Sequence, residues 1–218
     1  MRFLQKYIVL LVLCSSQVIA ASETVTQQED AVAQQDAAAL SALLGKMDTL
    51  EGRFSQQTLD ERGELLQEAS GTVAVKRPRR LLWKTLAPFE HLLVTNGKDL
   101  WLYDIDLEQA SRQDFSSDLD KAPALLLSGE LGAISSQYRI SRVDDGKQQV
   151  FTLLPSNSDS VFQAMSLRFV DGSIKAMVLE DNLNQKTLIE FDGIVLNPSI
   201  DDQVFEFSPP DGVDVSSS

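Results

Sequence analysis

The 218-residue sequence contains one cysteine, Cys14, and one histidine, His91. Cys14 lies in the N-terminal segment described below, so the remaining chain has no thiol for a disulfide or a metal ligand. His91 precedes Leu92-Leu93 in a predicted strand, without a G-x-S-x-G motif or another nucleophile context. No His, Cys and carboxylate cluster has the spacing of a zinc site, and no glycine-rich phosphate loop is present. We therefore expect no catalytic residue, no metal and no cofactor.

Positive charge is also scarce, because 32 acidic residues outnumber 19 basic ones and give a formal net charge of -13. Such a balance argues against nucleic acid as a partner and against broad binding to an anionic membrane. The basic residues that stand out are gathered within nine positions: Lys76, Arg77, Arg79, Arg80 and Lys84.

No apolar run approaches the roughly 20 residues that a membrane-spanning helix needs. Residues 1–20 instead resemble an export signal, with basic Arg2 and Lys6, the short apolar run Tyr7–Leu13 and a small-residue cleavage site ending at Ala20. Leu13 precedes Cys14 where a lipid-anchored protein would carry a small residue, so we expect no lipidation. The prediction is a cleaved signal peptide at 1–20 and a single periplasmic domain at 21–218.

The mature chain is predicted to start with a frayed polar lead-in, Ala21–Gln35, followed by an amphipathic helix. Apolar residues then recur at the i, i+3, i+4, i+7 spacing of a helix face: Leu40, Leu43, Leu44, Met47, Leu50 and Phe54.

Strands joined by hairpins fill most of the remainder. The connections include Asp60–Gly63, Thr95–Lys98, Asp144–Gly146 and Asp171-Gly172, and the last strands are expected at Thr187–Phe191 and Phe205–Phe207. About ten or eleven antiparallel strands follow in meander order, and so large a twisted sheet curls into a barrel or half-barrel. The fold class is mainly β with helices (α+β), an incomplete antiparallel barrel.

One segment interrupts the meander. Asp118–Leu131 is helical in composition, with Asp118 a plausible N-cap, Gly129 a stop, and Leu119, Ala122, Leu125 and Leu126 along one side. Together with the N-terminal helix it would cover the apolar concave face of the sheet, where Met165, Leu167 and Phe169 alternate with polar residues. A covered apolar shell of this kind encloses a binding cavity.

Arg77 has two interpretations. It follows Val73 and Val75 on one face of a predicted strand, before Pro78 interrupts the pairing. It is either the solvated basic end of an edge strand or a cation at the rim of the apolar cavity.

Several motifs, in this order and spacing, resemble the periplasmic outer-membrane lipoprotein carrier family, LolA. The resemblance extends over the whole mature chain and includes Gly52–Gln56, Gly71 with Val75–Pro78, Trp83, Asn96–Lys98 with Leu100–Asp104, Pro123–Gly129 and Phe205–Val215. Leu81 stands where members usually carry an aromatic residue, and Ile105 where a proline is common.

The resemblance implies an incomplete β-barrel whose apolar interior shields the acyl chains of lipoproteins between the inner and outer membranes. The implied partners are acylated lipoproteins, an inner-membrane lipoprotein-releasing ABC transporter and an outer-membrane acceptor lipoprotein. The family's Lys-Arg-Pro arginine bonds backbone carbonyls of the lid and corresponds to Arg77. We therefore expect a monomeric carrier whose cavity and lid are formed by Arg77, Leu81, Trp83, Leu43, Met47, Leu125, Leu126, Met165, Leu167 and Phe169.

Three other functions fit the same shell less well. A lipid-binding sensor or adaptor that regulates an envelope partner would usually carry a second domain, and none is visible. The outer-membrane acceptor would need a lipidated N-terminal cysteine. A lipid hydrolase would need the nucleophile constellation that this sequence lacks.

Overall fold

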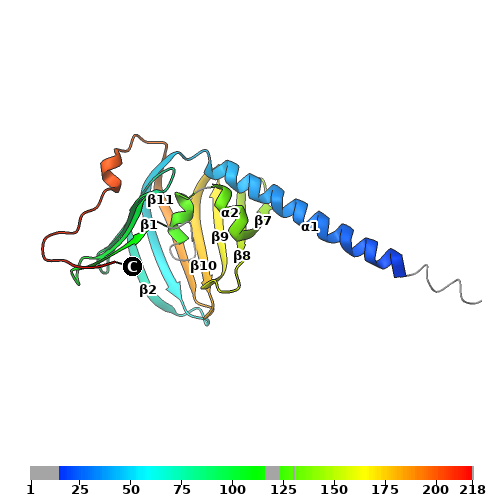
Figure 1. Ribbon diagram of the computed structural model, residues 1–218, viewed down its shortest axis with the longest axis horizontal. Helices are drawn as coiled ribbons and strands as arrows, with labels where there is room; N and C mark the ends of the chain where they lie inside the picture. The colour runs from blue at the N-terminus through cyan, green and yellow to red at the C-terminus, as the bar shows by residue number, and fades with distance from the viewer. Residues whose placement is uncertain (1–14, 116–122, 130, 218) are drawn as a thin grey trace, which may run out of the picture.

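A computed structural model describes the secondary structure of residues 15–115, 123–129 and 131–217. Twelve strands form one strongly curved sheet; the helix at 15–44 lies at its edge, and the short helices at 123–127 and 131–137 lie over its concave face (Figure 1). The elements are α1 (Ser15–Leu44), β1 (Thr49–Leu59), β2 (Leu65–Lys76), β3 (Arg80–Ala87), β4 (His91–Asn96), β5 (Asp99–Asp104), β6 (Gln109–Asp114), η1 (Pro123–Leu127), α2 (Leu131–Gln137), β7 (Tyr138–Asp144), β8 (Gln148–Pro155), β9 (Phe162–Val170), β10 (Ser173–Asp181), β11 (Lys186–Leu196), η2 (Asp202–Phe205) and β12 (Asp214–Ser217).

The strand order is β12-β6-β5-β4-β3-β2-β1-β11-β10-β9-β8-β7, so β12 and β7 are open edges and the barrel is incomplete, as predicted. The predicted hairpins are confirmed, and β1 pairs with β11 to join the two halves of the meander. Two details of the prediction were wrong. Phe205–Phe207 is not a strand, because Phe205 ends the short helix η2. The last strand is β12, which runs parallel to β6, so the sheet is not antiparallel throughout.

The N-terminal helix is longer at its start, and shorter at its end, than the sequence suggested. Ala21–Gln35 belongs to α1 and is not a frayed lead-in. At the other end α1 stops at Leu44, and Leu50 and Phe54 lie on β1, where both face the core. A spacing of four residues fits one strand face as well as one helix face, which explains the error.

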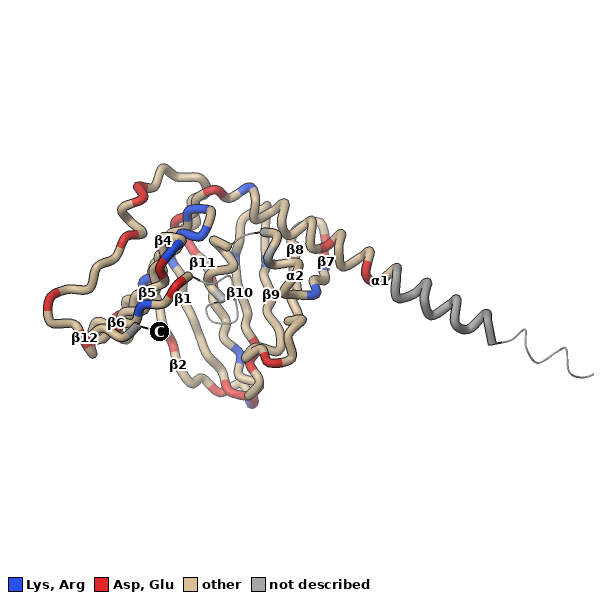
Figure 2. Tube along the Cα trace, in the orientation of Figure 1, with Lys and Arg blue, Asp and Glu red and all other residues tan. Residues whose placement is uncertain are grey.

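Helix α1 packs along the open edge of the sheet at β7 (Figures 1 and 2). Leu40 and Leu44 are fully buried there. Asp36 accepts a 3.0 Å hydrogen bond from the backbone N–H of Arg142 and lies 3.3 Å from Nε of the same residue. The helix therefore bonds directly to a backbone group of the edge strand. None of the described helices is long and apolar enough to cross a membrane.

The main hydrophobic core lies on the concave side of the sheet. It joins the inner residues of the strands to α1, η1 and α2 in one cluster of buried side chains. A smaller cluster lies on the outer face, where Ile200 and Phe205 cover Ala74 and Leu82. The same C-terminal segment places Phe207 with its ring centroid 5.4 Å from that of Trp101.

The predicted helical lid at Asp118–Leu131 is only partly described. Residues 116–122 and 130, which include Asp118, Leu119 and Ala122, lie outside the described residues. The described part differs from one continuous α-helix, because η1 is a 3₁₀ helix and α2 begins where the predicted helix was to end.

Candidate functional site

The nine apolar residues predicted to form the cavity and lid meet in the main core. Eight are buried, and Leu43 is partly buried against them. The buried ones come from the α1–β1 connection, β3, η1 and β9: Met47, Leu81, Trp83, Leu125, Leu126, Met165, Leu167 and Phe169.

Trp83 is the centre of an aromatic group on β1, β3 and β11. Its ring stacks on Phe54 with centroids 4.1 Å apart and meets the edge of Phe191 at 6.1 Å. Gly71 lies on β2, the strand between Phe54 and Trp83, and is opposite Phe54 on one side and Thr85 on the other. A Cβ at Gly71 would collide with the carbonyl oxygen of Lys84 and the Phe54 ring, so this close packing requires glycine.

Residues 123–129 and helix α2 cover the concave face as a lid, and three consecutive leucines anchor it. Leu125, Leu126 and Leu127 are all fully buried. Two hydrogen bonds tie the lid to the turn between β2 and β3: the Arg79 N–H donates to Ser128 O at 2.7 Å, and Arg77 Nη1 donates to Gly129 O at 2.8 Å. The lid is thus closed over the core by burial and by this turn.

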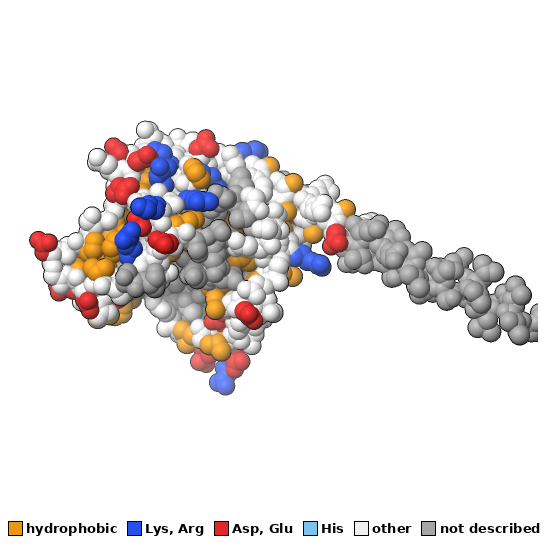
Figure 3. All heavy atoms as spheres, viewed as in Figure 1, with side chains coloured by type: hydrophobic (Ala, Val, Ile, Leu, Met, Phe, Trp, Pro, Cys, Tyr) orange, Lys and Arg blue, Asp and Glu red, His pale blue; other side chains and the backbone are white. Residues whose placement is uncertain are grey.

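Arg77 points inward, unlike its cationic neighbours. Lys76 and Arg80 form ion pairs with Asp202 on the outer face, at 2.6 and 3.5 Å. Lys and Arg positions cluster at this turn along the trace in Figure 2, and blue side chains gather on the same part of the surface in Figure 3. Arg77 instead bonds the lid, so of the two interpretations the structure favours the cation at the rim of the apolar interior.

The Arg77 guanidinium is incompletely paired. Its Nε and Nη2 atoms are buried and have no hydrogen-bond partner among the described residues. Burial lowers the pKa of Arg77 to about 10, and the nearby charge of Asp48 opposes this shift. The side chain is therefore still protonated at neutral pH, with buried donors left over.

A groove of about 410 Å³ opens on the concave side of strands β3 to β6 and β12. Trp83, Leu93 and Leu102 lie opposite one another in the register and therefore share the inner face. Leu102 is 44% exposed in the groove, although it lies on the same face as the buried core. The apolar inner surface thus continues from under the lid as far as Leu93 and Leu102, which a ligand can reach, and beyond them polar residues such as His91 and Asp104 line the groove.

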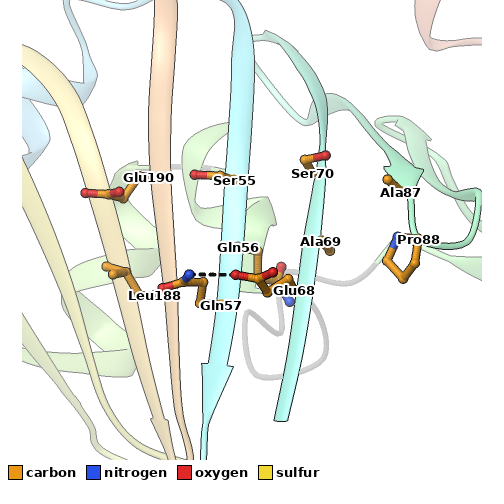
Figure 4. A pocket seen from close by; sticks show the side chains of 10 residues that line it. All are labelled: Ser55, Gln56, Gln57, Glu68, Ala69, Ser70, Ala87, Pro88, Leu188 and Glu190. Carbon is orange, nitrogen blue, oxygen red and sulfur yellow. Dashed lines mark hydrogen bonds between the residues drawn. The ribbon is translucent and has the colours of Figure 1, made fainter. Parts of the chain in front are cut away.

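A second groove, of about 450 Å³, lies on β1, β2, β11 and the end of β3 (Figure 4). Most of its side chains face outward, because they alternate along the strands with the inward-facing Phe54 and Phe191. They include Ser55, Gln57 and Glu190. Gln57 Nε2 donates to Glu68 Oε1 across it at 2.8 Å. This polar outer groove is not suited to an acyl chain.

Residues 45–208 match the profile of a family described as "Outer membrane lipoprotein carrier protein LolA". A protein from Hahella chejuensis named "Outer-membrane lipoprotein carrier protein" is 42% identical over 179 residues, which cover 81% of this chain and 86% of that one. The chain belongs to the LolA family. A relative of the same name from Azotobacter vinelandii is 44% identical over 176 residues, or 81% of this chain and 85% of its own length.

Solved structures with low sequence identity share the LolA-type fold of this chain. A DUF1329 family protein from Desulfovibrio piger has a TM-score of 0.51 at 13% identity, covering 78% of this chain and 95% of its own. An uncharacterized conserved protein from Thermus thermophilus has a TM-score of 0.50 at 12% identity, covering 83% and 99%. Membership of LolA, a family of carriers, agrees with the prediction that the chain is not an enzyme.

Sequence reasoning missed several residues of this LolA-family site. Leu127 and Ile134 complete the buried side of the lid, and Phe151 and Leu153 on β8 are buried in the same core. The alternation of Phe151, Thr152 and Leu153 was a usable strand signal. Leu127 gave no signal, since a helical lid would have turned it away from Leu125 and Leu126.

Proposed function

We propose that the chain carries acylated lipoproteins through the periplasm from an inner-membrane ABC transporter to an acceptor lipoprotein at the outer membrane. The relatives' names refer to lipoprotein carriage and the outer membrane, and residues 1–20 have the pattern of an export signal. In this proposal the concave face holds the acyl chains, and the α1 and 123–137 segments cover them.

The observation that carries the proposal is a continuous apolar surface, closed at one end by a small lid and open at the other. Leu125 and Leu126 cover the closed end, and Leu93 and Leu102 line the open groove. Exposing an acyl chain to water costs about 0.8 kcal/mol of free energy for each CH₂, so the cargo needs such a shield.

Release requires that the shield is not permanent. Hydrogen bonds from the Arg77 side chain and the Arg79 N–H, contributing about 0.5–3 kcal/mol each, connect the lid to the β2–β3 turn. Among the described residues 123–129, the burial of the three leucines and these bonds hold the lid, and none of these residues pairs with a strand, so this part can open without unfolding the sheet. Opening would join the buried core and the groove into one site.

The test is a charge placed on the inner face where it does not disturb folding. Leu102→Glu introduces a carboxylate into the groove at a position already 44% exposed. Val195→Glu is the matched control, since Val195 is 54% exposed and pairs with the outward-facing Glu51 on the other face. We expect Leu102→Glu to weaken binding of a fluorescent diacylated lipopeptide at least tenfold, because an acyl chain would desolvate the charge.

Val195→Glu should bind the lipopeptide like the wild type. Equal binding by both variants would place the cargo away from the concave face, and no binding by the wild type would remove the carrier proposal itself. Transfer of loaded lipopeptide to acceptor vesicles, measured separately, checks that bound cargo is also released.

A further inference from the structure

Arg77 holds more hydrogen-bond donors inside the protein than the closed lid uses. A guanidinium has five N–H groups, and the described part of the lid accepts from Nη1 alone. Nε and Nη2 are both buried without a partner among the described residues. These two atoms carry N–H groups that point in parallel from one edge of the guanidinium, an arrangement suited to paired acceptors.

The position of Arg77 relates these donors to the apolar surface. Arg77 follows Val73 and Val75, whose buried side chains face the core, and is the next residue in the same alternation. The register pairs Val73 with Trp83, the first residue of the inner groove. Four residues of strand separate Arg77 from that row, or about 13 Å. An acyl chain starting at Arg77 would therefore extend along the inner face toward the groove.

Few ligand groups match buried donors at the end of an apolar surface. The acceptor must enter together with the hydrocarbon, and it must not require a hydration shell of its own. The ester carbonyl groups that join two fatty acyl chains to a glyceryl unit meet both conditions, and they occur in pairs.

We propose that Nε and Nη2 of Arg77 donate hydrogen bonds to the ester carbonyl oxygens of a diacylglyceryl cargo. This inference rests on the proposed function, and it adds a polar recognition point to an otherwise apolar site. Arg77 then has two partners, the lid in the empty protein and the ester groups in the loaded one. Cargo is selected by how its chains are attached, in addition to its hydrocarbon content.

The experiment compares two lipopeptides that differ only at the linkage. One carries two ester-linked hexadecanoyl chains on its glyceryl unit, and the other carries two ether-linked hexadecyl chains, which lack the carbonyl oxygens. Because hydrogen bonds to charged groups in a dry site contribute strongly, we expect the wild type to bind the ester probe at least tenfold more tightly.

Arg77→Met keeps a long side chain without donors, and it should bind both probes with equal affinity. Arg77→Lys keeps the charge but not the paired N–H groups, and an intermediate preference is expected. Arg80→Met is the matched control, because Arg80 pairs with Asp202 on the outer face, and it should keep the full ester preference.

The outcomes separate the two proposals. A wild type that binds both probes equally, or an ester preference that survives in Arg77→Met, overturns the ester recognition and leaves the carrier function intact. Failure to bind either probe overturns both. Tighter, Arg77-dependent binding of free hexadecanoic acid than of the ester probe would assign Arg77 to carboxylates instead.

Discussion

Replacing Arg77 by methionine should stabilise the empty protein slightly, although the change removes a hydrogen bond. The guanidinium lies among apolar residues, and its burial lowers the pKa of Arg77 to about 10. Methionine is of similar length and has no charge to desolvate, and its flexible side chain fills irregular apolar spaces. The sign of the effect depends on which of two opposing contributions is larger.

Their magnitudes follow from the structure. A pKa near 10, well below the ordinary value of a guanidinium, means that the buried charge costs about 3 kcal/mol. The bond from Arg77 Nη1 to Gly129 O offsets about 1.5–3 kcal/mol of this cost. The net gain for Arg77→Met is therefore about 1 kcal/mol. For a domain of this size that corresponds to an increase in Tm of about 2–4 °C.

Thermal and urea unfolding of the cargo-free wild type, Arg77→Met and Arg80→Met measure this difference. Arg80→Met removes a surface ion pair with Asp202 and should change stability by less than about 1 kcal/mol. A decrease in Tm of more than about 4 °C for Arg77→Met, without a decrease for Arg80→Met, would show that the reasoning is wrong. The bond to the lid would then outweigh the cost of the buried charge.

The pH dependence gives an independent check on the same residue. Because the pKa of Arg77 is lower in the folded protein, the unfolded chain binds the proton more tightly. The stability of the wild type relative to Arg77→Met should therefore rise as the pH increases from about 10 toward 12.5. The other titrating groups are the same in both proteins, so their effects cancel in the difference in stability between wild type and variant. Urea unfolding midpoints of the two proteins at pH 9 and pH 11 measure this difference. A difference that stays constant or widens in favour of the variant contradicts the assigned shift.

The remaining predictions concern the lid, the aromatic group and the N-terminus. Leu126 in the lid and Leu153 in β8 are both fully buried. Leu153→Ala should lower the free energy of unfolding by about 3 kcal/mol. Leu126→Ala should lower it less in urea unfolding and instead speed hydrogen exchange of the lid amides, because a lid that opens separately from the sheet contributes less to global stability. Equal losses would mean that lid and sheet unfold together. Gly71→Ala should lower Tm by several degrees or prevent folding, since the added methyl group meets the Lys84 carbonyl oxygen, and an unchanged Tm would contradict this packing. Intact-mass measurement of exported protein should give a chain that begins at Ala21 without an acyl group, and a diacylated Cys14 would reverse that prediction.

The sheet was largely predictable because its signals are local. Asn96-Gly97 and Asp171-Gly172 identify hairpins by turn chemistry, and alternation on strands such as β9 identifies the buried face. The parallel strand β12 was not predictable in this way. Its Val215 is followed by serines, and it is held by pairing with β6, a segment about 100 residues away in the sequence.

The same distinction applies to the candidate site: residues with a local signal were predictable, and contacts between distant segments were not. The burial of Met165, Leu167 and Phe169 followed from alternation within one strand. The stack of Phe54 on Trp83 did not, because it depends on the absence of a side chain at Gly71 on the strand between them. In the lid, Leu125 and Leu126 were predicted from one side of a helix, but Leu127 was not, since its burial follows from a 3₁₀ helix that the local pattern did not indicate.

The bond from Asp36 to the Arg142 N–H also affects how copies of the protein meet one another. An uncovered edge strand is a template on which another chain can add a strand, which leads to polymers and aggregates. With a carboxylate already bound to that backbone group and α1 lying along β7, an approaching strand finds charge and a helix instead of a free ladder position. A carrier with an open sheet must keep its binding surface available to lipid without exposing its edge strands to other copies of itself, and at β7 the position of α1 allows both.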